Sequence, residues 1–297
     1  MTGGSAASGV SNSVDAPGAD AARKDERPRR LHDLGPRVGS ALVLAPAAIA
    51  ATVAGGPWLA AATGAASVAM SYEWTRMSEP TSRGWAFAVC FLGVFGAILA
   101  ASWGYLGPAF GWLVACGAVS ALRRRTVTGV LETFGGLLYV GAPCAMFLAL
   151  RAQPGGREAV LSMFLIIWAT DAAAYFAGAL IGGPRVSRRL SPTKTWAGLI
   201  FGTLAGSAAG AGCAALFHGP GWLWAQVGAI IGATGLCGDL LESFLKRRFG
   251  VKDASGLIPG HGGFLDRLDG MITATVLTSA VLLADPALLG RLLEAPA

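Results

Sequence analysis

Long apolar segments follow one another along most of this chain, and no other feature restricts its fold as strongly. Hydrophobic residues make up 54% of the sequence and charged residues 13%, whereas a soluble domain carries about a quarter charged residues. A helix needs about 20 apolar residues to cross ~30 Å of hydrocarbon. The sequence therefore predicts an all-α, polytopic integral membrane helix bundle with about nine transmembrane helices, within a range of seven to ten. The nine candidate segments lie at 39–54, 57–74, 84–102, 105–122, 130–150, 159–181, 196–217, 222–242 and 270–290.

The first two segments leave an alternative open. They are short, and only Gly55, Gly56 and Pro57 separate them. A re-entrant pair, which enters and leaves the membrane on one side, would fit this spacing as well as two full crossings.

The basic residues predict the orientation of the chain. If the N-terminus is cytoplasmic, 20 of the 23 Lys and Arg residues fall in the N-terminal tail or in loops on the same side. Only Arg151, Arg157 and Arg291 fall elsewhere. This asymmetry is what the positive-inside rule predicts, so the net charge of +6 reflects topology and contact with anionic lipid. We expect no nucleic-acid partner.

Residues 1–36 differ in composition from the rest of the chain. They are rich in Gly, Ala, Ser and Asp, end in a charged stretch, and have no apolar core after the first methionine. Such a segment is neither a signal peptide nor a membrane span. We expect a disordered cytoplasmic tail, followed by one transmembrane domain at 37–297.

Glycines recur at every fourth position in the seventh segment. Gly198, Gly202, Gly206 and Gly210 form one ridge along a helix, which allows a neighbouring helix to approach closely. The eighth segment has a similar series from 228 to 235. We interpret both as packing surfaces, since the irregular backbone of a glycine-rich phosphate loop is not expected there.

Two pairs of carboxylates flank a polar segment, Ser243–Asp269, near the C-terminus. Asp239 and Glu242 precede it at an i, i+3 spacing, and Asp266 and Asp269 repeat that spacing at its end. Each pair shares a helical face. Because Mg²⁺ is usually held by one or two carboxylates together with phosphates and water, these four acids are candidate metal ligands. For Asp239 and Glu242, the alternative is an ion pair with a basic residue one turn further on, Lys246 or Arg247.

Basic residues lie between the two acidic pairs, where they suit the phosphates of a nucleotide. His261 lies among them in a PGHGG turn and is either structural or functional. The basic residues between the pairs are Lys246, Arg247, Arg248, Lys252 and Arg267.

A second polar segment, 182–196, follows the sixth apolar segment. Lys194 there, with the hydroxyls of Ser191 and Thr195, suits phosphate oxygens, although a basic cytoplasmic loop is the simpler interpretation. Asp171 lies inside the sixth segment, where it is either a hydrogen-bonding partner within the bundle or part of the site.

These polar residues match the motif of a known family in type and spacing. The chain resembles the phosphatidate cytidylyltransferase (CDP-diacylglycerol synthase) family over about residues 38–290. Two upstream motifs are present, Gly-Asp-Leu at 238–240 and Ser-Pro-x-Lys-Thr-Trp at 191–196. The C-terminal motif is matched at Ser243, Lys246, Arg247, Lys252, Asp253, Pro259, His261, Gly262, Gly263, Asp266, Arg267 and Asp269.

The chain departs from the family pattern at a few upstream positions. Thr193 stands where the family usually has Lys, and Ala197 stands where it usually has Glu. Gly178 and Ala179 replace a common Gly-Arg pair. We assign no catalytic role to these positions.

The resemblance implies transfer of CMP from CTP to phosphatidate, giving CDP-diacylglycerol and pyrophosphate. It implies Mg²⁺ as cofactor, with a second cation left open, and a catalytic signature between residues 239 and 269. The implied location is the bacterial inner membrane, with the site on the cytoplasmic face. A homodimer is left open. The implied metal ligands are Asp239, Asp266, Asp269 and Glu242; the implied catalytic residues are Asp239, Asp266, Lys246, Arg247 and His261; the implied substrate-binding residues are Lys194, Ser191, Thr195, Ser243, Lys252, Asp253 and Arg267.

Two other classes of function remain compatible with the sequence. Another CTP-dependent lipid enzyme, such as a polyprenol or phytol kinase or a CDP-archaeol synthase, would share the nucleotide and metal chemistry. A transporter or channel would use intramembrane acids along a pathway, but the polar residues gather at one face, and Asp171 alone is expected to lie deep.

Overall fold

The computed structural model describes residues 34–79, 83–122, 126–187, 189–257, 262–285 and 287–293. The predicted N-terminal tail falls almost wholly on residues 1–33, which lie outside this part of the chain. Among the described residues, the first helix begins at Leu34.

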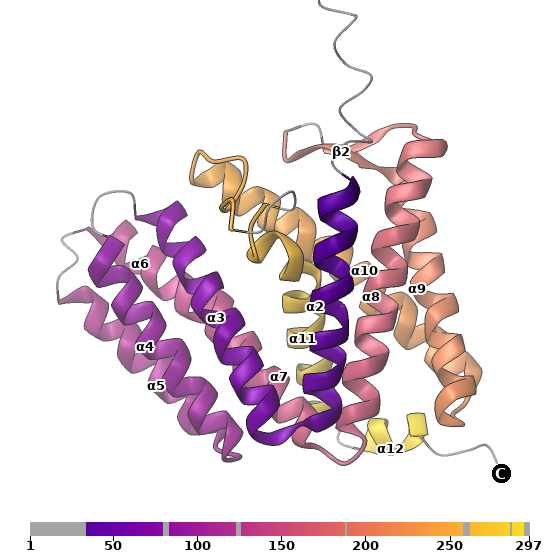
Figure 1. Ribbon diagram of the computed structural model, residues 1–297, viewed down its shortest axis with the longest axis horizontal. Helices are drawn as coiled ribbons and strands as arrows, with labels where there is room; N and C mark the ends of the chain where they lie inside the picture. Colours follow the sequence, from indigo (N-terminus) through magenta and orange to yellow (C-terminus); the bar gives the residue numbers. More distant parts are fainter. Residues whose placement is uncertain are drawn as a thin grey trace, which may run out of the picture.

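Helices make up nearly all of the described chain (Figure 1). Their order is α2 (Leu34–Ala54), α3 (Gly56–Ser78), α4 (Arg83–Ser102), α5 (Leu106–Ala121), α6 (Val127–Gly136), the π-helical turn η1 (Leu137–Gly141), α7 (Ala142–Ala152), α8 (Gly156–Leu180), α9 (Trp196–Phe217), α10 (Gly221–Arg248), α11 (Leu265–Ala284) and α12 (Ala287–Leu293). The predicted all-α class is therefore confirmed. One addition is a two-stranded antiparallel hairpin, β1 (Arg185–Ser187) and β2 (Ser191–Thr195), between α8 and α9.

Eight of the nine predicted segments each fall on one helical stretch, counting α6, η1 and α7 as one, and the ninth, 270–290, runs past the end of α11. Six helical stretches are long and apolar enough to cross a membrane. Among the described residues these six are 84–102, 127–152, 156–180, 196–217, 221–248 and 265–284. The chain is therefore a membrane protein of several apolar helices.

The boundaries of the last two predicted segments are corrected by the structure. Helix α10 continues to Arg248, six residues beyond the predicted end at 242, and α11 begins at Leu265, five residues before the predicted start at 270. Both extensions are charged, so hydropathy alone did not find them. The predicted segment 270–290 is also too long at its other end, because α11 ends at Ala284 before the sequence Asp285–Pro286.

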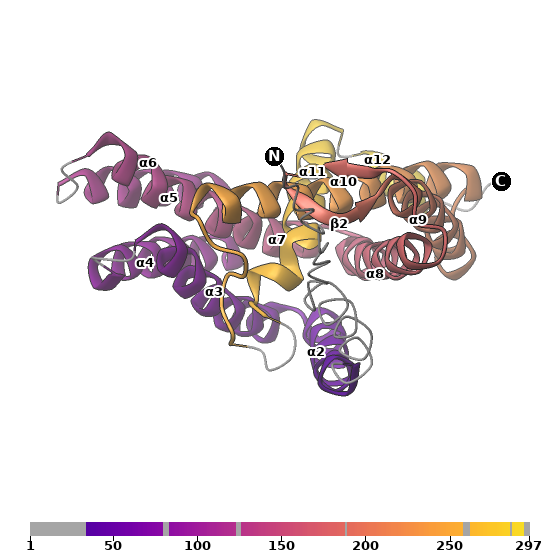
Figure 2. The same cartoon turned by 90° about the horizontal axis from the view of Figure 1, so that it is seen from above.

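The helices form two groups joined by α7 and α11. One hydrophobic core gathers side chains from α3, α4, α5 and α7 with the start of α11. A second core joins α7, α8, α10 and α11. Because α7 and α11 belong to both cores, the polar start of α11 is held where the two groups meet. Seen from above, α2 stands to one side of the bundle and packs against α3 and α8 (Figure 2).

Glycines set the distance between α9 and its neighbours, as the sequence predicted. A Cβ atom on Gly206 would lie 2.9 Å from the carbonyl oxygen of Gly228, and one on Gly210 would overlap the carbonyl oxygen of Trp224. On the side toward α8, a Cβ on Gly198 would lie 2.8 Å from the carbonyl oxygen of Ala174. The backbones of α8, α9 and α10 thus pack in direct contact.

We predict that Gly210→Ala lowers the thermal unfolding midpoint in detergent, since the new methyl group overlaps backbone that has no rotamer to change. Overpacking of this kind costs about 1–3 kcal/mol. Gly212→Ala is the matched control, because nothing lies within 4 Å of its added Cβ on the same helix. Equal midpoints for the two variants would contradict the close packing of α9 on α10.

Candidate functional site

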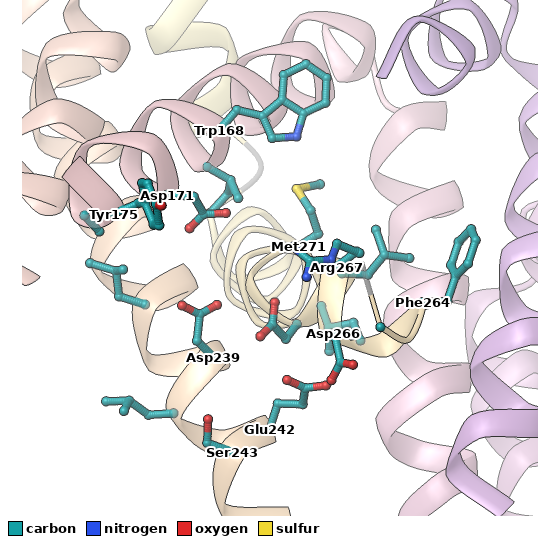
Figure 3. A pocket seen from close by; sticks show the side chains of 18 of the residues that line it. Trp168, Asp171, Tyr175, Asp239, Glu242, Ser243, Phe264, Asp266, Arg267 and Met271 are labelled. Atoms are coloured by element: carbon teal, nitrogen blue, oxygen red, sulfur yellow. The ribbon is translucent and has the colours of Figure 1, made fainter. Parts of the chain in front are cut away.

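A cavity of about 1770 Å³ lies among α2, α3, α7, α8, α9, α10, α11 and the hairpin. Its lining is apolar over the surfaces of α2, α3 and α7 and charged where α10, α11 and β2 meet. Figure 3 shows Asp171, Asp239, Glu242 and Asp266 around a common space, with Arg267 beside it. The acidic pairs that are far apart in sequence are thus brought together.

The extended end of α10 supplies the centre of the charged region. Lys246 lies one turn after Glu242, and its ammonium contacts Glu242 Oε2 at 2.9 Å. The same ammonium contacts Asp266 Oδ1 on α11 at 2.6 Å. Glu242 and Asp266 are 4% and 10% exposed, so one cation holds two largely buried carboxylates together. The ion pair that was the alternative for Glu242 is therefore present.

The hairpin contributes a second ion pair. Lys194 on β2 donates to Asp239 Oδ2 on α10, which ties the hairpin to the cavity wall. Thr195, the next residue, accepts a hydrogen bond from Gly198 N at 3.1 Å and so caps the start of α9. Lys194 is therefore placed by a helix cap immediately after it in the chain.

The first turn of α11 presents the second acidic pair. Asp266 Oδ2 accepts a hydrogen bond from Gly263 N at 2.8 Å, which leaves Oδ1 directed to Lys246. Asp269 lies one turn further along the cavity lining. A Cβ on Gly238 would overlap the backbone of Asp269, so glycine at this position allows α10 and α11 to meet beside the site.

Glu73 on α3 is a polar residue that the sequence analysis missed. It is fully buried and accepts hydrogen bonds from Phe264 N and Leu265 N, each at 2.7 Å, and from the hydroxyl of Ser255. It lies inside the predicted segment 57–74. A carboxylate in an apolar span is costly unless it has partners, and that cost was the available signal.

The remaining predicted residues divide into three groups. His261 lies outside the described residues, and its role stays a prediction. Ser191 is buried in the hairpin, while Arg247 and Lys252 are exposed, and these three lie outside the cavity lining. The predicted residues within the lining are Lys194, Thr195, Asp239, Glu242, Ser243, Lys246, Asp253, Asp266, Arg267 and Asp269.

The cavity lining is rich in carboxylates, the oxygen ligands that a divalent cation prefers. Among the described residues, no group of three or more His, Cys, Asp or Glu side chains is arranged to hold a metal ion. Nevertheless, six acids and only four bases line the cavity, and Glu242 Oε1 is buried without a hydrogen-bond partner. An anionic ligand would therefore enter a region with excess negative charge, which a divalent cation would offset.

The fold and the site define an integral membrane helix bundle with an ionic cavity. Comparison with known proteins then gives the family. The chain belongs to the cytidylyltransferase family, whose profile matches residues 36–284.

Sequence matches to known proteins cover more than half of this chain. A protein of Brucella suis biovar 1 is 36% identical over 255 residues, which is 83% of this chain and 92% of that protein. A protein of Brucella melitensis biotype 1 has the same identity and coverage. A protein of Rickettsia bellii is 30% identical over 174 residues, or 56% of this chain and 75% of that protein. All three are named phosphatidate cytidylyltransferase.

We predict that Lys246→Met strongly destabilises the protein, because it leaves Glu242 and Asp266 buried without their shared cation. Removing one partner of a buried ion pair costs about 3–5 kcal/mol in free energy of unfolding. Adding Glu242→Gln should recover part of this loss, since it removes one of the two uncompensated charges. Denaturant unfolding in mixed micelles measures the effect. The control is Lys252→Met at an exposed position, and equal losses in Lys246→Met and the control would refute the bridging role.

Proposed function

We propose that this chain is a phosphatidate cytidylyltransferase, which transfers CMP from CTP to phosphatidate and releases pyrophosphate. The observation that carries the proposal is one cavity that joins the charged cluster of a cytidylyltransferase to an apolar lining. A soluble nucleotide and a lipid phosphate can meet in such a space. The names of the similar Brucella proteins support the same acceptor.

The chemistry needs charge neutralisation more than proton transfer. A phosphate oxygen of phosphatidate attacks the α-phosphorus of CTP, and pyrophosphate leaves in line with the attack. Because the nucleophile is already anionic, alignment and electrostatic stabilisation supply most of the catalysis. Lys194, Lys246 and Arg267 line the cavity and would bind the phosphates of the two substrates.

Lys194 and Lys246 can change partners when substrate binds. Each is now paired with a carboxylate on α10, and Lys246 also contacts α11. Incoming phosphates compete for these ammonium groups, which would free Asp239, Glu242 and Asp266 to hold a cation. The ion pairs therefore keep both the basic and the acidic groups in place before substrate arrives.

Mg²⁺ is the cation that we propose for this site. Asp239 and Asp266 would hold it, with Asp269 and Glu242 as further ligands or as neighbours of the ligands. When bound, Mg²⁺ supplies positive charge against the triphosphate. The excess of acids over bases in the cavity lining supports this proposal.

The apolar part of the cavity would hold the acyl chains of phosphatidate. Leu44 and Ala48 of α2, Leu59 and Met70 of α3, and Phe147 of α7 line it. In Figure 2, α2 lies at the edge of the bundle with α3 next to it, and α7 lies nearer the middle. The lipid phosphate would then lie near the ionic cluster while the chains stay in an apolar environment.

We further propose nine membrane crossings with a cytoplasmic N-terminus and a cytoplasmic site, in a bacterial inner membrane. At about 1.5 Å per residue, α2 and α3 are each over 30 Å long, which favours two crossings over a re-entrant pair. The start of α2, the hairpin and the α10–α11 connection lie at one end of the bundle (Figure 1). Arg151 lies at the other end, where its guanidinium donates a hydrogen bond to the Thr52 carbonyl. It is one of the few basic residues expected on that side.

The purified protein should form labelled CDP-diacylglycerol from α-labelled CTP, phosphatidate and Mg²⁺. Removal of divalent cations by a chelator should abolish the product, and added Mg²⁺ should restore it. A lipid kinase would instead leave the label on CDP, and a transporter would give no labelled lipid. Either of these last results, under lipid conditions that support folding, would overturn the proposed function.

Asp239→Asn and Asp266→Asn should each lower kcat by about 10²- to 10³-fold, the size expected when a group that stabilises transition-state charge is lost. The protein should remain folded, as judged by its elution profile and unfolding midpoint. Asp285→Asn is the control, since Asp285 pairs with Arg291 at the far end of α11. Near-normal turnover in both site variants would remove these residues as metal ligands.

The topology can be tested by introducing one cysteine at a time, in a background where the exposed Cys237 is replaced by Ser and the four less exposed native cysteines remain. In spheroplasts with an intact inner membrane, Leu257→Cys, between α10 and α11, should be shielded from an impermeant maleimide added to the medium. Trp58→Cys, at the opposite end on α3, should react. Both side chains are exposed, at 48% and 72%. The reverse pattern would place the site on the other face.

A further inference from the structure

Glu73 joins two parts of the signature segment to α3. Its carboxylate accepts the hydroxyl of Ser255 on one side of residues 258–261, and the backbone N–H groups of Phe264 and Leu265 on the other. Glu73 is 0% exposed, and it is not among the residues that line the cavity. Its effect on the site must therefore be transmitted through the backbone that it holds.

The start of α11 depends on this distant carboxylate. A helix leaves its first N–H groups without partners inside the helix, and the residue at the N-cap of α11, Phe264, makes no side-chain capping bond. Glu73 supplies that cap from another helix, where the helix dipole also favours a negative charge. Asp266 accepts the neighbouring N–H of Gly263. The two carboxylates thus share the capping of α11.

The packing around this cap leaves no space for adjustment. A Cβ on Gly263 would lie 2.9 Å from both carboxylate oxygens of Glu73 and 2.9 Å from Ala254 Cβ. Ser255 is also held locally, since its oxygen accepts a hydrogen bond from Leu257 N at 3.1 Å. Glycine at 263 therefore leaves the space that the Glu73 carboxylate occupies.

We propose that Glu73 is a positioning residue for cytidylyl transfer. By fixing Phe264 and Leu265, it sets where the next residue, Asp266, meets Lys246, and where the first turn of α11 faces the cavity. Glu73 touches neither substrate nor metal in this proposal. The effect on turnover rests on the proposed function, whereas the effect on the start of α11 does not.

The requirement is for two acceptor oxygens, because three donors converge on the side chain. Glu73→Gln keeps the size of the side chain but replaces one acceptor with an amide donor, which opposes a backbone N–H or the Ser255 hydroxyl. Glu73→Asp keeps both oxygens and is shorter by one methylene. The order of activity should therefore be wild type, then Glu73→Asp, then Glu73→Gln.

The test combines kinetics with hydrogen–deuterium exchange on the full-length protein in micelles. Glu73→Gln should lower kcat by about 10- to 100-fold, the size expected when catalytic groups are displaced slightly, with a smaller change in KM for CTP. Exchange at the Phe264 and Leu265 amides should become at least about tenfold faster. Glu73→Asp should recover part of both losses.

The matched control is Ser279→Ala, which removes a buried hydrogen bond between α11 and the Met146 carbonyl, near the far end of the same helix. It should leave both kcat and exchange at 264–265 unchanged. Loss of kcat in the control equal to that in Glu73→Gln would reduce Glu73 to a general packing role and overturn the proposal.

The remaining outcomes separate the two proposals. Wild-type exchange and wild-type kcat in Glu73→Gln would refute the positioning role while the proposed function stands. Absence of CDP-diacylglycerol with the wild-type protein would refute the proposed function, whereas faster exchange at 264–265 would still support the cap. If Glu73→Gln does not fold, Ser255→Ala carries the test: it removes one of the three contacts and should lower kcat and speed exchange by about threefold or more.

Discussion

The ammonium of Lys246 between Glu242 and Asp266 is the interaction on which the site depends. It links α10 to α11, and it does so where two hydrophobic cores meet and little water reaches the carboxylates. Opposite charges attract strongly in such surroundings, but burying either carboxylate without a cation would cost free energy. The cluster is consequently held together as a unit, and in the proposed function its members would exchange these partners for the phosphates and the cation of a substrate complex.

Two further constraints keep this unit in place, and neither involves a cation. Close backbone contact through Gly238 lets α10 and α11 lie side by side, and Glu73 caps the start of α11 from α3. In addition to these two constraints, the Lys194–Asp239 ion pair ties the hairpin to α10. Parts of the chain that lie before and within the signature segment therefore support one wall of the cavity, while the lining from α2 and α3 provides the other.

Much of this arrangement was predictable because its signals are local. Apolar runs located the helices, the four-residue glycine spacing predicted the α9 packing surface, and the i, i+3 acids predicted two charged helical faces. The errors have physical causes. Charged residues extend α10 to Arg248 and start α11 at Leu265, because ion pairs and caps there replace the hydropathy that normally marks a span. Arg247 and Lys252 match the family motif and are exposed outside the cavity lining. Their roles stay predictions, since spacing does not reveal which way a side chain points.

The sequence by itself determined that the chain is a membrane helix bundle, and its polar motif indicated the cytidylyltransferase family. Composition and spacing are sufficient for this, since burial in lipid requires apolar runs and the chemistry requires particular side chains. The tertiary structure alone decided which cation meets which carboxylate, and that Glu73 on α3 caps α11 nearly 200 positions away in the chain. Those contacts depend on how the helices pack in three dimensions, and the separation of two residues along the sequence does not reveal which helices will pack together.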